Sequence, residues 1–153
     1  MKFEYIDPFV SSTIRVLDLT VHADVSQGNL SLVKSERLDG SVAIVIKVRD
    51  ENEGSIIVNM DTATALRIAG VLTGENNDSL TPYSLDSLCE LANVIAGNAS
   101  SKLNDLGYDF KIEPPRVLEK EKISGETLDL EIFQVPLITD YGEITVNVAM
   151  RTN

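Results

Sequence analysis

A carboxylate and a carboxamide lie three residues apart in the segment DSLCELANVIAGNASSKLNDLG, residues 86–107. The segment is predicted to form one long helix, in which Glu90 and Asn93 lie on the same side, one turn apart. A glutamate can bind a cationic group, while an asparagine can accept one hydrogen bond from a water molecule and donate another. The spacing therefore points to chemistry in which this pair holds a cation and orients a water.

Two faces are expected on this helix. The apolar face would pack on the core and consists of Leu85, Leu88, Cys89, Ala92, Ile95, Ala96, Ala99, Leu103 and Leu106. The polar face consists of Asp86, Glu90, Asn93, Gly97, Ser100, Ser101 and Asn104. This polar face contains no lysine or arginine and so lacks the i,i+4 ion pairs that support many solvated helices. An ordinary solvated face remains the alternative, because a Glu and an Asn at this spacing are common.

Gly97 lies in the middle of the polar face, where a glycine costs about 1 kcal/mol relative to alanine. One explanation is a close crossing of another helix or loop within the same fold. The other is a partner molecule whose backbone approaches the bare helix beside Glu90 and Asn93. A bulky side chain at position 97 would then hold that partner away.

Other kinds of catalytic site find little support. Cys89 is the only cysteine, and the sixth residue after it is Ile95 rather than the arginine of a Cys-x5-Arg phosphatase loop. A buried structural thiol is the better interpretation. His22 is the only histidine and falls at the predicted end of a helix. No cluster of residues has metal-ligand spacing, so no metal site is expected.

Charge and composition limit the partners. The formal net charge is −11, which disfavours nucleic acids and anionic membranes. The N-terminal residues lack a secretory signal pattern, and no window approaches the roughly 18 apolar residues of a membrane span. A cytoplasmic protein that binds a protein or a small ligand is expected.

Periodicity and turn signals predict one α+β domain over residues 1–153, with helices packed on one face of an antiparallel sheet. The expected helices are 8–21, beginning with Asp7 as N-cap, then 62–73, capped by Asp61, and 84–106. The expected strands are 30–36, 41–50 and 55–60, which read as a meander, then a short strand within 108–113, and 128–138 and 143–150.

The sequence resembles the CheX/CheC-type chemotaxis phosphatases, whose signature is an Asp or Ser, then Glu, then Asn, and a downstream proline. Asp86, Glu90 and Asn93 match that order, and Pro114 and Pro115 share the place of the proline. The segments YIDPFVSSTIRVL, DTATALRIAGVLTG and ELANVIAGNA are also similar to the family, so the likeness covers nearly the whole chain. Because neither of the other two expected helices contains Glu-x-x-Asn, the chain most resembles single-motif, CheX-like members.

This resemblance implies hydrolysis of the aspartyl phosphate of a CheY-like response regulator, which brings its own Mg²⁺ and a lysine. Asn93 would position the attacking water without a covalent enzyme intermediate, and Glu90 would accept the regulator's lysine. Asp86, Gly97 and the two prolines would contact the partner. The resemblance further implies a homodimer joined through sheet edges, with no cofactor of its own. The alternative is a non-catalytic module of the same fold that only docks a response regulator or flagellar switch protein.

Overall fold

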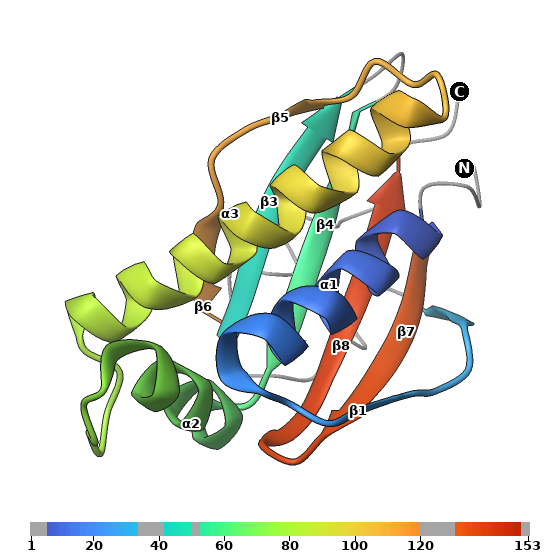
Figure 1. The fold of residues 1–153 in the computed structure, drawn as a ribbon. Coiled ribbons are helices and arrows are strands. Elements are labelled where there is room, and N and C mark those ends of the chain that lie inside the picture. Colours follow the sequence, from blue (N-terminus) through green and yellow to red (C-terminus); the bar gives the residue numbers. More distant parts are fainter. Residues whose placement is uncertain (1–5, 34–41, 50–52, 120–130, 151–153) are drawn as a thin grey trace.

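The computed structural model describes residues 6–33, 42–49, 53–119 and 131–150. In this part of the chain, helices cover one face of an eight-stranded antiparallel sheet (Figure 1), which confirms the predicted α+β class. The elements are α1 (Ile6–Val21), β1 (Val25–Gln27), β2 (Ser31–Val33), β3 (Val42–Arg49), β4 (Glu53–Met60), α2 (Thr62–Thr73), α3 (Pro82–Asp105), β5 (Lys111–Ile112), β6 (Arg116–Glu119), β7 (Glu131–Thr139) and β8 (Gly142–Met150).

The sheet runs in the order β1-β7-β8-β4-β3-β5, with β2 also paired to β7 and β6 also paired to β3. The predicted β3–β4 and β7–β8 hairpins are confirmed by their antiparallel registers. The predicted meander is wrong at its first strand, because β2 pairs with β7 and not with β3. That partner lies a hundred residues away in sequence, and a local pattern carries no information about such pairing. The strands β1 and β6 were not predicted.

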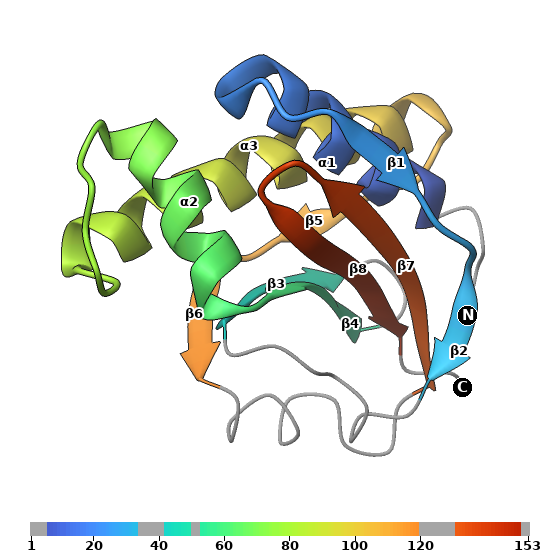
Figure 2. The same cartoon turned by 90° about the horizontal axis from the view of Figure 1, so that it is seen from below.

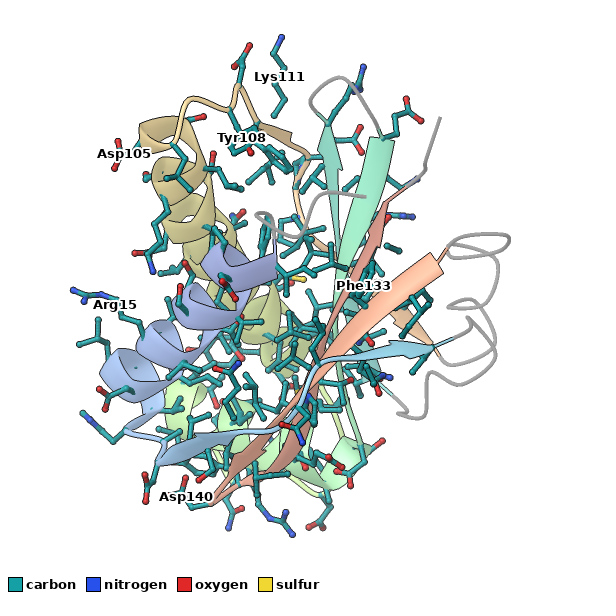
Figure 3. All side chains as sticks on the ribbon, turned by 90° about the vertical axis from the view of Figure 1, so that its right-hand side faces the viewer. Arg15, Asp105, Tyr108, Lys111, Phe133 and Asp140 are labelled. Carbon is teal, nitrogen blue, oxygen red and sulfur yellow. The ribbon has the colours of Figure 1, made fainter. Side chains whose placement is uncertain are left out.

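The main core lies between the helices and the sheet (Figures 2 and 3). Helices α1 and α3 contribute fully buried side chains to it, including Phe9, Leu17, Leu88 and Leu103. The opposite face of the sheet holds a smaller cluster that consists of Ala43, Val45, Ile57, Ile132 and Ala149. With both of its faces packed, the sheet gives α3 a rigid base and leaves the outer side of that helix open.

The helix boundaries correct two expectations. Helix α1 already includes Ile6, so Asp7 is inside the helix and is not its N-cap. Pro8 is tolerated because first-turn amides have no intrahelical acceptor. Helix α3 begins two residues before the expected start, where Thr81 Oγ1 accepts a hydrogen bond from Ser84 N at 3.1 Å. After α3, Gly107 adopts a left-handed φ of 96°, as expected for the residue that ends a helix.

Asp61 caps α2 as predicted, since its Oδ1 accepts a hydrogen bond from Thr64 N at 2.7 Å. This bond, made to the charged carboxylate, lowers the pKa of Asp61. Asp61→Ala should therefore cost about 1 kcal/mol of stability at neutral pH and lower Tm by about 2–4 °C. Asp61→Asn should retain most of the cap.

The pH dependence of this effect follows from the direction of the pKa shift. A depressed carboxyl pKa adds stability above the unfolded-state value of about 3.9, and this stability is lost as pH falls through the folded-state pKa. Thermal unfolding followed by circular dichroism should thus show a smaller gap between wild type and Asp61→Ala at pH 3 than at pH 7. An equal gap at both pH values would contradict a charged cap.

Candidate functional site

Helix α3 has one buried and one exposed face, as its sequence predicts. Its buried residues are Ser84, Leu88, Leu91, Ala92, Ile95, Ala96, Ala99 and Leu103. Leu106 was expected on this face and is instead 63% exposed. The helix ends at Asp105, and Leu106 is its C-cap residue.

The predicted site residues on α3 come together on its outer side. Asp86, Glu90, Asn93 and Gly97 are all exposed and follow one another at spacings of four, three and four residues. Neighbours at such spacings have Cβ atoms about 5–6 Å apart. The side chains of Asp86, Glu90 and Asn93 form no hydrogen bond or ion pair with another described residue. Their polar groups are therefore directed to solvent and available to a partner.

No packing contact within the described chain requires a glycine at position 97. A Cβ atom built on it would have no atom from outside its own stretch of helix within 4 Å. A close crossing of a helix or loop would have placed atoms inside that distance. Among the described residues, the first of the two explanations for this glycine finds no support, and the open backbone beside Asn93 remains.

Cys89 lies between Asp86 and Glu90 in sequence and is half-buried. Burial raises the pKa of its thiol, and the neighbouring carboxylates Asp86 and Glu90 raise it further. The thiol is therefore held in its protonated, poorly nucleophilic form at neutral pH. This agrees with a structural cysteine.

Pro114 and Pro115 lie outside the α3 face, on the connection between β5 and β6. Both of these strands pair with β3, so the prolines interrupt what would otherwise be a single edge strand. Pro114 is exposed and Pro115 is half-buried. Their predicted contact with a partner stays a prediction.

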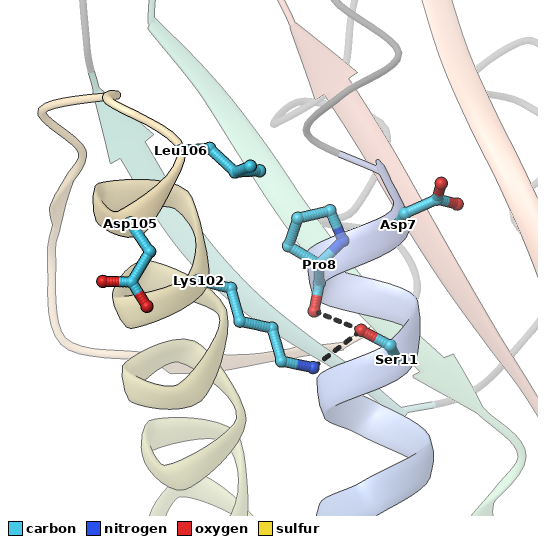
Figure 4. Close-up of a pocket in the computed structure, with 6 residues that line it drawn as sticks. All are labelled: Asp7, Pro8, Ser11, Lys102, Asp105 and Leu106. Atoms are coloured by element: carbon cyan, nitrogen blue, oxygen red, sulfur yellow. Dashed lines mark hydrogen bonds between the residues drawn. The ribbon is translucent and has the colours of Figure 1, made fainter.

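A pocket of about 510 Å³ opens between the first turns of α1 and the last turn of α3 (Figure 4). Lys102, the only basic residue of α3, lines it and donates a hydrogen bond from Nζ to Ser11 Oγ at 2.9 Å. The lysine is thereby directed toward α1. As a result the face that carries Glu90 and Asn93 has no basic side chain from its own helix.

The sequence reasoning missed two exposed apolar residues on this face, Tyr83 and Val94. Tyr83 lies seven residues before Glu90 and Val94 lies four after it, so both share its side of the helix. The helical period places them there from sequence alone. Their side chains carry no group that does chemistry, so residue type gives no reason to single them out.

Neither a metal site nor a membrane span is found in the described part of the chain. No three His, Cys, Asp or Glu residues there are grouped so as to hold a metal ion. None of its helices combines the length and apolar character that crossing a bilayer requires. The expectation that the protein needs no cofactor of its own stays a prediction.

Comparison with known proteins finds relatives of this chain among the chemotaxis phosphatases. The family model described as chemotaxis phosphatase CheX matches residues 42–137, which include all of α3. The CheY-P phosphatase CheX of Thermotoga maritima is 27% identical over 138 residues, covering 90% of this chain and 86% of that protein.

Solved structures agree with this match. A chain of the CheX-CheY-BeF3-Mg+2 complex from Borrelia burgdorferi is 29% identical, with a TM-score of 0.81 and coverage of 99% of this chain and 100% of that one. A CheC-like superfamily protein from Shewanella sp. PV-4 shares the fold, with a TM-score of 0.85 at 24% identity and coverage of 99% and 100%. The family match spans more than half of the chain, and the chain therefore belongs to the CheX family of chemotaxis phosphatases.

Proposed function

We propose that this protein hydrolyses the aspartyl phosphate of a CheY-like response regulator. The observation that carries the proposal is the pairing of Glu90 and Asn93 on an exposed face of α3, without partners among the described residues. The names of two relatives support it. One, at 27% identity, is called a CheY-P phosphatase, and another, at 29% identity, is found in a complex with CheY.

Asn93 is the residue proposed to act on the attacking water. Its carboxamide does not titrate near neutral pH, so it can accept a hydrogen bond from the water and donate another without acid-base chemistry. An acyl phosphate is already reactive, and the main requirement is to hold the water in line with the bond that breaks. Because α3 is packed on the sheet, the backbone of Asn93 is fixed before the partner arrives.

Glu90 is the residue proposed to bind the regulator. It lies one turn before Asn93 and would accept a charge-assisted hydrogen bond from a lysine beside the acyl phosphate. Lys102, the basic residue of the same helix, is bound to Ser11 and does not compete. Anchoring this lysine would carry Asn93 into the partner's active site.

The reaction needs no covalent intermediate on this chain. The water oxygen bonds to phosphorus, the bond from phosphorus to the regulator's aspartyl oxygen breaks, and inorganic phosphate leaves with the aspartate restored. The Mg²⁺ of this reaction belongs to the regulator. Cys89, the nearest conventional nucleophile, is half-buried and has a raised pKa.

The test is to mix the purified protein with a phosphorylated CheY-like regulator from the same cell and to follow the release of phosphate. An acceleration of at least tenfold over the regulator alone, about 1.4 kcal/mol of barrier, is expected. Binding without acceleration would reject the proposed hydrolysis and favour a docking module of the same fold.

We also propose a cytoplasmic homodimer joined through a sheet edge. In the described part of the chain, β1 and β2 are three-residue strands that pair with β7 and with no other strand. Leu32 in β2 and Leu30 just before it are exposed. Edges of this kind are available to a second chain. Sedimentation equilibrium should give twice the chain mass of 16.7 kDa. A monomer at micromolar concentration would contradict the dimer. It would not affect the proposed role of the α3 face.

A further inference from the structure

Two apolar side chains are exposed on the same face of α3 as the proposed catalytic pair. Tyr83 is 55% exposed and Val94 is 45% exposed. Tyr83 lies two turns before Glu90, and Val94 lies one turn after it. At 1.5 Å per residue the two positions span about 16 Å along the helix, with the carboxylate between them.

The surroundings of these side chains are acidic and uncrowded. Asp86 and Glu90 lie between them along the helix, and the backbone at Gly97, one turn after Val94, is open. An exposed ring and an exposed branched side chain, with carboxylates between them, match a protein interface, where aromatic anchors are surrounded by polar groups. The chemistry fits a partner surface that combines a lysine with apolar side chains.

Exposed apolar residues are common on protein surfaces, so a single one does not indicate a binding site. Their position relative to other functional residues is more informative. Among the large apolar side chains exposed in the described chain, Tyr83 and Val94 are the two within the body of α3. Asn93 and Val94 lie on opposite sides of Glu90 around the helix, since each residue adds 100°. A partner centred on Glu90 would therefore reach Asn93 on one side and Val94 on the other.

We propose that Tyr83 and Val94 are the apolar contacts through which α3 docks on the phosphorylated response regulator, an inference that rests on the proposed function. Val94 contacts the regulator on the side of Glu90 that is opposite Asn93. Tyr83, two turns away from Glu90, fixes the direction in which α3 crosses the partner. Both residues act on binding of the regulator and neither touches the phosphate.

The test measures binding and turnover separately. Affinity is measured with the regulator loaded with beryllofluoride and Mg²⁺, and turnover with the phosphorylated regulator. Tyr83→Ala should raise Kd and KM about tenfold and Val94→Ala about fivefold, with kcat at saturating regulator within twofold of wild type. Tyr83→Phe keeps the ring and should bind like wild type. The double variant should show the product of the two effects, since the positions lie far apart.

Val71→Ala is a matched control, because Val71 lies on α2 and is also 45% exposed. It should leave Kd within twofold of wild type. If Val94→Ala binds like wild type, or if Val71→Ala weakens binding as much, the inference is overturned.

The outcomes for this inference and for the proposed function are distinguishable. A wild-type protein that binds the loaded regulator without accelerating phosphate release would reject hydrolysis, while the Kd comparison would still decide the docking residues. A wild-type protein that binds no loaded regulator would overturn both.

Discussion

Asn93→Ala is expected to lower the rate of regulator dephosphorylation by at least tenfold, about 1.4 kcal/mol of barrier, while leaving affinity for the regulator nearly unchanged. The variant removes the carboxamide that orients the water and leaves Glu90 in place to anchor the partner. Alanine is also a better helix former than asparagine, so α3 should be at least as stable. Single-turnover phosphate release at saturating protein measures the effect on chemistry alone.

Asn98→Ala is the matched control for this prediction. Asn98 is an asparagine of the same helix whose Nδ2 donates a hydrogen bond to Val94 O at 3.0 Å, a local bond within α3. Its replacement should leave the single-turnover rate within twofold of wild type. Normal turnover by Asn93→Ala would mean that water is positioned by the regulator itself, and equal losses in both variants would indicate a general disturbance of the helix.

Glu90→Gln is expected to act mainly on binding. Loss of one partner from a desolvated charge-assisted hydrogen bond costs about 2–5 kcal/mol, which corresponds to an increase in Kd of at least about thirtyfold. The regulator's lysine would be left facing a neutral amide. Isothermal titration with the beryllofluoride-loaded regulator gives this Kd directly, and its dependence on salt should be weaker than that of wild type.

Glu143→Gln is the matched control for Glu90→Gln. It removes the same charge from β8, next to the β7–β8 turn and away from α3. The comparison distinguishes loss of a local ion pair from a change in net charge. Glu143→Gln should change Kd by no more than about twofold, since single exposed charges contribute little. If Glu90→Gln and Glu143→Gln weaken binding equally, the pairing of Glu90 with a lysine is wrong and only long-range attraction remains.

The exposure of the candidate site could be predicted from sequence because its residues lie on a single helix. The exposed positions of Glu90, Asn93 and Gly97 follow from the helical period, which depends only on local sequence. The same period would also have placed Tyr83 and Val94. Residue type does not mark these two as binding residues, because single exposed apolar side chains are common on protein surfaces.

Other parts of the fold could not be predicted because distant segments determine them. The partner of β2 is β7, and β6 forms an edge strand beside β3 after two prolines. Strands of three or four residues have too few positions for an alternating pattern to stand out. The two prolines at 114 and 115 mark an interruption, but the segment after them carries no signal of the strand it joins.

Gly97 has a consequence for attempts to engineer this protein. Because a Cβ at this position meets no other part of the described fold, alanine fits there and should stabilise α3 by up to about 1 kcal/mol. A directed-evolution campaign that selects only for heat resistance would favour that substitution. It would then fill the bare helix surface beside Asn93, so improved variants should be screened for signal termination as well as for melting temperature.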